Sequence, residues 1–225
     1  MKNYSAFDIL GPIMIGPSSS HTAGAARLGK IAATIAAGEI VEVKFLLNGS
    51  FAKTYKGHGT DKALVAGILG FDPWDEEIKE SFAIAKSRNL KFYFEEVVME
   101  GAHPNTVKFL IKKRDNSIST ITGSSIGGGN VIVTEINGME IEFTGEYPTL
   151  IINHRDRPGM ISKVSTIISD NNINIAFLKV YRSKKGKNAS MIFEMDNVIT
   201  ETILDKIKEI EDIESVTVIN PIKEG

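Results

Sequence analysis

Hydrophobic positions recur along the first part of the chain with two different periods, and each period predicts one kind of element. Apolar and small residues spaced three and four apart predict helices over residues 22–37, 60–70 and 75–88. Alternating or continuous apolar runs predict strands over residues 41–47, 91–98, 106–112, 117–122, 130–136 and 139–144. Asp115-Asn116 and Asn137-Gly138 supply hairpin turns. We therefore expect an α+β fold, a mixed α/β domain with a largely antiparallel sheet.

After residues 145–148, which are rich in turn formers, the order of the patterns changes. It becomes strand, helix, strand, strand, helix, strand over residues 149–153, 158–170, 173–181, 189–195, 199–210 and 215–219. This βαββαβ order is typical of a ferredoxin-like unit. The sequence therefore predicts two domains, residues 1–147 and residues 148–225.

Composition and charge are those of an ordinary globular protein. Of the 225 residues, 42% are hydrophobic and 24% are charged, and the formal net charge is −2. This balance gives no reason to expect a nucleic-acid or membrane partner. The apolar runs are too short to span a bilayer, and the N-terminus lacks the pattern of a signal peptide. We expect a cytoplasmic protein.

Cysteine and histidine limit the metal chemistry of this chain. It has no cysteine, which excludes disulfides and thiolate ligands. Its four histidines are His21, His58, His103 and His154, and no two share the spacing of metal ligands on one helix. We therefore expect no metal site on this chain.

The segment Gly16–Thr22 carries the densest candidate chemistry. A Gly-Pro turn is followed by Ser18, Ser19, Ser20, His21 and Thr22, directly before a predicted helix. Hydroxyls and unpaired amide groups at a helix start can hold a carboxylate, and a histidine there can transfer a proton near neutral pH. The alternative is an ordinary serine or threonine cap beside an incidental histidine.

Three further segments contain candidate site residues. His58 lies between two glycines just ahead of Asp61, and a solvent-exposed loop beside a helix cap is the alternative. His103 and Asn105 flank a proline, and a turn leading into a strand is the alternative there. Residues 127–129 are three glycines that fit neither a P-loop nor a dinucleotide fingerprint. We expect a tight loop facing the active cleft, with a plain sheet connection as the alternative.

These segments resemble the motifs of the iron–sulfur-dependent L-serine dehydratases. The matching blocks are Gly16–Thr22, Gly57–Asp61, His103–Thr106 and Ser125–Gly129, and they stand in the order of that family. In two-chain members, the beta chain carries these motifs and an ACT domain, while the alpha chain carries the cysteines. The absence of cysteine and the form of the tail are similar to those of the beta chain.

The resemblance implies a reaction and a distribution of roles. The two-chain enzyme would convert L-serine to pyruvate and ammonia, with a 4Fe–4S cluster held by the alpha subunit because this chain has no thiolate. It implies catalytic roles for His21, Ser19, Ser20 and Thr22. It implies substrate binding by Ser18, His58, Asp61, His103, Asn105, Gly127 and Gly128.

The tail resembles an ACT domain, most specifically in the turn at Arg155–Ile161. ACT domains commonly pair with a second copy, so the resemblance implies a homodimer. Amino-acid effectors of some ACT domains bind at positions matched here by His154, Asp156, Gly159 and Asn174. Asp156 replaces an asparagine of that pattern. Its carboxylate could hold the ammonium group of an effector but would repel the effector's carboxylate. A dimerisation module without a ligand therefore stays open.

A second class of function is compatible with the tail. On that reading the chain is a stand-alone amino-acid-sensing protein, which binds ligands and transforms none. The ACT-like tail favours it, whereas a histidine among consecutive hydroxyl groups favours an enzyme. A cysteine-bearing companion in the neighbouring reading frame would favour the lyase.

Overall fold

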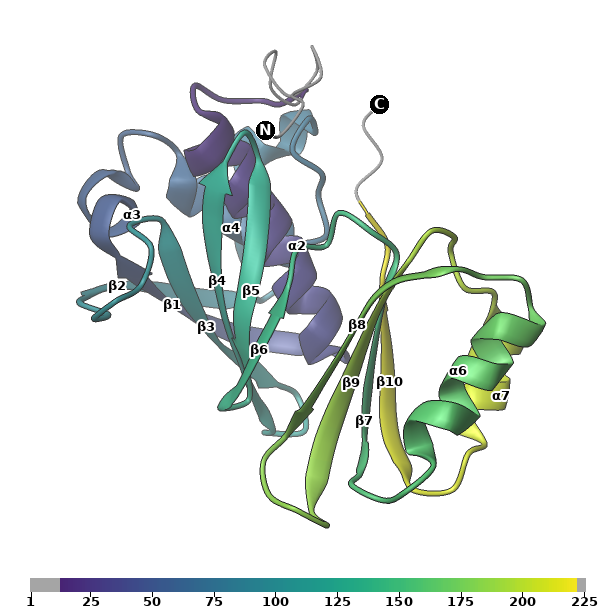
Figure 1. The fold of residues 1–225 in the computed structure, drawn as a ribbon. Helices are drawn as coiled ribbons and strands as arrows, with labels where there is room; N and C mark the ends of the chain where they lie inside the picture. Colours follow the sequence, from purple (N-terminus) through teal and green to yellow (C-terminus); the bar gives the residue numbers. More distant parts are fainter. Residues whose placement is uncertain (1–12, 222–225) are drawn as a thin grey trace. The chain divides into compact units, whose positions relative to one another are not determined.

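The structure is a computed structural model that describes residues 13–221 (Figure 1). The described residues up to Gly138 form one compact unit, and Met139–Pro221 form a second. Residues 1–12 of the first predicted domain and residues 222–225 of the second lie outside the described residues. The predicted boundary between residues 147 and 148 stays a prediction, since the compact units divide ahead of the strand that precedes it.

A six-stranded mixed sheet organises the first part of the chain. The strands are β1 Ile40–Asn48, β2 Lys91–Val97, β3 Thr106–Lys113, β4 Ile118–Gly127, β5 Asn130–Ile136 and β6 Met139–Phe143. Their order is β2-β1-β3-β4-β5-β6. Only β1 and β2 pair in parallel among the pairs that β1 to β5 form, and the others are antiparallel. The expected α+β class with a largely antiparallel sheet is confirmed.

The helices of the first unit approach each other closely. They are the π-helical turn η1 Ser19–Ala23, α2 Gly24–Ala36, α3 Gly49–Thr54, α4 Thr60–Ile68, the 3₁₀ turn η2 Glu76–Glu80 and α5 Ser81–Ser87. Glycines allow α2 and α4 to cross, because a Cβ on Gly29 would lie 2.6 Å from the backbone oxygen of Leu64. Gly123 similarly lets α2 pack on β4, since its Cβ would lie 2.7 Å from Leu28 Cδ2.

Three elements of the structure differ from the prediction. The helix expected over 75–88 is divided into a 3₁₀ turn and α5, and Ser81 at the junction bonds through its hydroxyl to the backbone oxygen of Lys62 at 2.9 Å. Helix α3 was not expected, because Asn48-Gly49 reads as a turn. Strand β4 runs to Gly127, well beyond the predicted end at residue 122, since sheet pairing overrides the weak strand preference of glycine and serine.

The second unit contains the predicted βαββαβ order. Its elements are β7 Thr149–Arg155, α6 Met160–Asp170, β8 Ile175–Arg182, β9 Asn188–Met195, α7 Glu201–Lys208 and β10 Ile213–Ile219. The strand order is β10-β7-β9-β8, and both helices cover one face of this antiparallel sheet (Figure 1). Apolar side chains from the sheet and both helices form one core between them. The ferredoxin-like prediction is confirmed.

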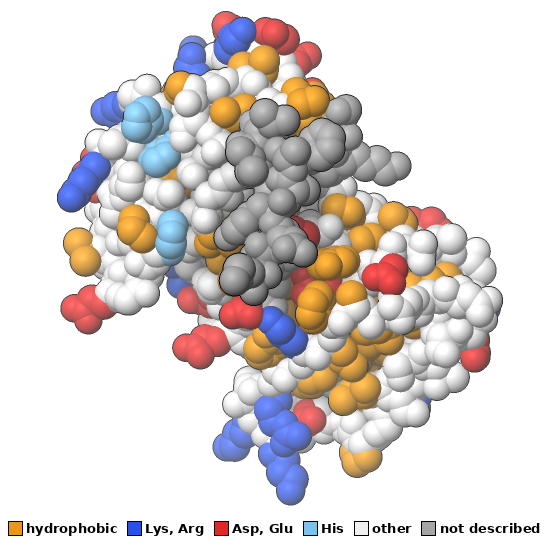
Figure 2. Space-filling view, turned by 45° about the horizontal axis from the view of Figure 1, so that its top comes forward, with side chains coloured by type: hydrophobic (Ala, Val, Ile, Leu, Met, Phe, Trp, Pro, Cys, Tyr) orange, Lys and Arg blue, Asp and Glu red, His pale blue; other side chains and the backbone are white. Residues whose placement is uncertain are grey.

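The surface of the second unit carries exposed hydrophobic side chains, which Figure 2 shows gathered in orange. Large examples are Ile161, Phe177, Leu178, Val180 and Val198. Within residues 13–221, no helix is both long enough and apolar enough to cross a bilayer.

Candidate functional site

Ser18 begins the helical segment that carries His21. Its Oγ accepts a hydrogen bond from the backbone amide of His21 at 3.2 Å, and its carbonyl accepts one from Thr22 at 2.8 Å. Gly16 has φ +130°, and a Cβ there would lie 2.6 Å from two side-chain atoms of Thr22. The helix thus begins at Ser19, earlier than predicted, so that Ser20 also lies inside its first turn.

His21 lies at the centre of a small cluster. Its Nε2 is 3.1 Å from the Oγ of Ser50, and its Nδ1 is 3.4 Å from the Oγ of Ser18. The ring packs edge-on against Phe51, with centroids 5.3 Å apart, and against His58, with centroids 4.8 Å apart. The structure therefore brings together two of the predicted histidines, whose side chains differ in exposure: His21 is half-buried and His58 is exposed.

Burial shifts the pKa values of His21 and Asp61 in opposite directions, and in each case it favours the neutral form. Burial, and to a lesser degree the neighbouring His58, lowers the pKa of His21 below the usual 6.5. Burial raises the pKa of Asp61, and hydrogen bonding and charge at Lys62 oppose that rise. Asp61 lies in the first turn of α4, where its Oδ1 accepts the amide of Lys62 at 2.8 Å. Near pH 7 His21 is therefore a neutral imidazole.

The turn around Pro104 holds the start of α3. The Pro104 carbonyl accepts the amides of Ser50 at 2.8 Å and Phe51 at 3.3 Å. The Asn48 side chain donates to the carbonyl of His103 at 3.2 Å. Gly49 has φ +58°, and a Cβ there would lie 2.7 Å from the Pro104 oxygen, so only glycine permits this approach.

Asn105 connects the same turn to strand β4. Its backbone oxygen accepts the amide of Ser125 at 3.0 Å, and its amide group lies 3.5 Å from the Ser125 oxygen. The Oγ of Ser125 points at Gly24, where any Cβ would collide with it. Within the described part of the chain, Asn105 Oδ1 and Ser125 Oγ are buried without a hydrogen-bond partner. Such atoms are available to a bound polar group.

The glycine run forms a hairpin turn between β4 and β5. Gly127 pairs with Asn130, and the two residues between them, Gly128 and Gly129, have φ values of +62° and +83°. This tight turn connects the two strands and requires positive φ at both positions. Arg27 Nη1 donates to the Gly129 oxygen at 3.2 Å. A substrate-binding role for Gly127 and Gly128 stays a prediction.

These contacts link motifs that lie far apart in the sequence. His21 lies within hydrogen-bond distance of Ser50, and the Ser50 amide donates to the Pro104 oxygen. The next residue, Asn105, accepts the amide of Ser125, and the Ser125 side chain lies against Gly24. Figure 2 shows histidine side chains in pale blue on one face of the first unit. Ser50 and Asn48 were not among the predicted site residues, although an Asn-Gly-Ser segment directly after a strand is a signal that could have found them.

The residues of this chain do not fit an iron–sulfur cluster. The chain has no cysteine, and within residues 13–221 no group of three or more His, Asp or Glu side chains could hold a metal ion. Its chemistry at the site consists of imidazoles, hydroxyls, amides and carboxylates.

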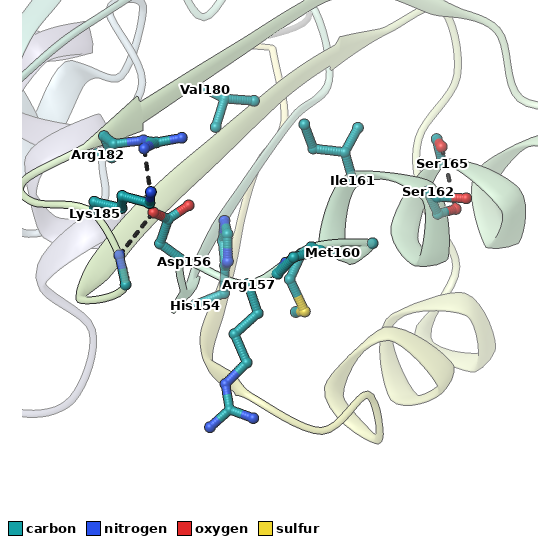
Figure 3. A pocket seen from close by; sticks show the side chains of 13 residues that line it. His154, Asp156, Arg157, Met160, Ile161, Ser162, Ser165, Val180, Arg182 and Lys185 are labelled. Atoms are coloured by element: carbon teal, nitrogen blue, oxygen red, sulfur yellow. Dashed lines mark hydrogen bonds and ion pairs between the residues drawn. The ribbon is translucent and has the colours of Figure 1, made fainter.

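The second unit contains an open pocket of about 730 Å³ between the β7–α6 turn and the β8–β9 hairpin (Figure 3). His154, Asp156 and Gly159 line it, as do Arg157, Arg182 and Lys185. His154 is 3% exposed, and its Nδ1 lies 2.7 Å from the Arg155 oxygen. Its Nε2 is buried and has no partner among the described residues.

Asp156 is engaged with its own chain. Its Oδ2 accepts the amide of Gly186 at 2.9 Å and lies 3.5 Å from Nη1 of Arg182 (Figure 3). Asn174 does not line the pocket, and its side-chain amide donates to Asp196 at 2.8 Å. The pocket therefore gathers three of the four predicted effector positions.

Comparison with known proteins covers nearly the whole chain. Residues 5–136 match the family described as "Serine dehydratase beta chain", and residues 148–212 match "ACT domain". The chain is 42% identical to the "L-serine dehydratase, beta chain" of Peptoniphilus asaccharolyticus over 212 residues, which is 94% of this chain and 96% of that protein. It is 42% identical to the "Probable L-serine dehydratase, beta chain" of Bacillus subtilis over 217 residues, 96% of this chain and 98% of that one.

A second group of relatives shares less of its own length. The "D-3-phosphoglycerate dehydrogenase" of Methanocaldococcus jannaschii is 32% identical over 202 residues, which are 87% of this chain and 37% of that protein. The two near-full-length relatives and both family matches confirm the resemblance inferred from the motifs. The chain belongs to the serine dehydratase beta chain family, with an ACT domain at its C-terminal end.

Proposed function

We propose that this chain is the beta subunit of an L-serine ammonia-lyase and forms the active site together with an alpha subunit. The observation that carries the proposal is the meeting of His21, His58 and the His103–Asn105 turn around Ser50 and Pro104. A chain that only sensed amino acids would not need this cluster, and the full-length likeness to beta chains of L-serine dehydratases favours the subunit.

The reaction requires a base for the α-proton of serine. His21 is neutral near pH 7 because burial lowers its pKa, so its imidazole can accept that proton. Loss of the β-hydroxyl as water gives 2-aminoacrylate, whose imine tautomer adds water and releases ammonia and pyruvate. The exposed His58 beside His21 would contact the substrate. It also disfavours the protonated form of His21, because His58 helps to lower the pKa of that imidazole.

Polar groups around the histidines suit the two ends of the amino acid. Asn105 Oδ1 is a buried acceptor that fits an ammonium group, and Ser125 Oγ lies beside the same turn. The half-buried hydroxyls of Ser18, Ser19 and Ser20, with buried Thr22, would bind the carboxylate. Roles for Asp61, His103, Gly127 and Gly128 in substrate binding belong to the same proposal.

The cluster chemistry belongs to the companion chain. A 4Fe–4S cluster requires thiolate ligands, and this chain has no cysteine, so the alpha subunit would hold the cluster. The steps assigned to this chain are therefore binding of serine, orientation of its α-carbon and movement of the proton.

Purification of the chain with and without its companion tests the proposal. The chain alone is expected to be colourless and to form no pyruvate from L-serine. The two-chain preparation, kept anaerobic, is expected to be brown and active, and to lose activity in air. Serine-to-pyruvate turnover by this chain alone, or an inactive two-chain preparation with an intact cluster, would contradict it.

For the second unit we propose homodimerisation and binding of a small amino-acid effector. The exposed side chains of Ile161, Leu178 and Val180 would be covered by a second copy, and the pocket at His154 and Asp156 would take the ligand. Light scattering of the full chain measures the first claim, and calorimetric titration with single amino acids measures the second. A monomer at tens of micromolar, which is a concentration far above most specific affinities, contradicts the homodimer.

A further inference from the structure

We propose that Ser50 is a positioning residue for His21: its Oγ accepts a hydrogen bond from Nε2–H and thereby leaves Nδ1 as the atom that receives the proton of the substrate. This inference rests on the proposed function, because it assigns the orientation of the histidine in that reaction. Its starting observation is the 3.1 Å distance between His21 Nε2 and Ser50 Oγ.

The two ring nitrogens of His21 have unequal partners. The Nε2 to Ser50 distance of 3.1 Å is that of an ordinary hydrogen bond, whereas Nδ1 lies 3.4 Å from Ser18. Ser18 Oγ already accepts the backbone amide of His21. In a neutral imidazole one nitrogen donates and the other accepts, so a bond from Nε2–H to Ser50 leaves the lone pair on Nδ1.

Ser50 is held in place more firmly than a surface hydroxyl. Its amide and that of Phe51 both donate to the Pro104 oxygen, at 2.8 Å and 3.3 Å. Its own carbonyl accepts Thr54 Oγ1 at 2.8 Å. Gly49 brings the backbone against Pro104 in a conformation that excludes a side chain. A partner fixed in this way can orient an imidazole with little loss of entropy.

The ring of His21 is also fixed from its sides. Phe51 packs edge-on at 65° and His58 at 71°, so the ring has little freedom to turn over and exchange its nitrogens. The neighbour of Ser50 in the sequence thus fixes the plane of the ring while Ser50 fixes its tautomer. Both residues come from the short helix α3, which no catalytic motif of the sequence includes.

The first test reads the tautomer in the isolated full-length chain by NMR of the ¹⁵N-labelled imidazole. We expect a protonated Nε2 and an unprotonated Nδ1 in His21 near neutral pH, with an Nε2–H signal protected from exchange with water. Ser50→Ala is expected to lose that protected signal, and Ser50→Thr is expected to keep it. A wild-type ring protonated at Nδ1, or a signal unchanged in Ser50→Ala, would overturn the proposal.

The second test measures kinetics of the two-chain enzyme. Ser50→Ala is expected to lower kcat about tenfold with a smaller change in KM, the size expected for one lost hydrogen bond that orients a reacting group. Ser50→Thr should recover most of kcat. Ser87→Ala is the control, because among the described residues its hydroxyl bonds only to the Ile84 oxygen on α5. An unchanged kcat in Ser50→Ala would overturn the positioning role.

The two tests separate this inference from the function on which it rests. If the wild-type complex fails to convert serine, the proposed function fails while the NMR result still decides the tautomer. If the complex is active and the tautomer of His21 does not depend on Ser50, only the positioning role fails.

Discussion

The histidine cluster of the first unit and the pocket of the second unit are built in opposite ways. The cluster joins segments that are far apart in sequence, from Ser18 to Pro104, through hydroxyls, amides and a half-buried, neutral imidazole. The pocket uses the β7–α6 turn, the first turns of α6 and the β8–β9 hairpin with the end of β8, all in the same small unit. Its lining includes the charged residues Asp156, Arg157, Arg182 and Lys185. A fixed, uncharged arrangement suits proton transfer, whereas a charged, open one suits reversible binding.

The sharpest way to break this comparison is to remove His21. His21→Ala is expected to lower kcat of the two-chain enzyme by about two orders of magnitude or more, the contribution typical of a general base. Thr34→Ala is the matched control, because this exposed threonine lies on the helix that follows His21, and its hydroxyl bonds to the Lys30 oxygen alone within residues 13–221. Steady-state kinetics measure kcat of both variants. Equal kcat values would mean that His21 takes no part in the reaction and only lies beside the helix cap.

The next effect concerns the close packing behind the cluster. Gly24→Ala is expected to destabilise the chain by about 1–3 kcal/mol, because the new methyl group collides with Ser125 Oγ. Helix propensity alone predicts the opposite sign. Gly57→Ala serves as the control, since the nearest atom to its Cβ would be 3.8 Å away. Thermal unfolding of the two variants compares them, and a stabilised Gly24→Ala would show that the contact yields.

How much of each region could be foreseen depended on the range of the interactions. The second unit followed its local patterns, so its βαββαβ order and the pocket residues on the β7–α6 turn were predictable. In the first unit, the sequence motifs predicted His21 and His58 as candidate site residues, but they did not predict that the two rings contact each other. Helix α3 was missed because Asn48-Gly49 resembles a turn, and its packing on Pro104 depends on a residue far along the chain.

Asn174 in the second unit was selected from the sequence alone, and its hydrogen bond to Asp196 could not be foreseen from the local pattern. Its role in effector binding stays a prediction. In strand β4 the Ser and Gly residues predict a loop, yet they form part of a strand. The reason for a glycine there is the packing of Leu28 against Gly123, which the local sequence does not show.

A moderate effect is expected on the acid limb of activity. Because burial lowers the pKa of His21, folding favours its neutral form. The contribution to stability is complete above the usual 6.5 and is lost as pH falls from there to the lowered pKa, whereas activity is lost only as pH falls through that lowered pKa. His58→Gln removes the smaller cause and should raise the pKa of His21, yet leave it below 6.5 because burial remains. NMR titration of His21 measures both values. A His21 pKa above 6.5 in either protein would contradict burial as the larger cause.

The smallest effect is expected in the second unit, at Asp156. Asp156→Asn removes the charge facing Arg182 but keeps an oxygen for the Gly186 amide, whereas Asp156→Ala removes both. Since Arg182 is largely exposed, the ion pair is worth less than about 1 kcal/mol, and Asp156→Asn should unfold almost as the wild type does. Asp156→Ala should exchange the Gly186 amide proton faster with water, because that donor loses its acceptor. Amide exchange followed by NMR distinguishes the two variants. Equal acceleration in both would mean that the charge, and not the hydrogen bond, fastens the β8–β9 hairpin, and the open pocket would then depend on an electrostatic contact that salt weakens.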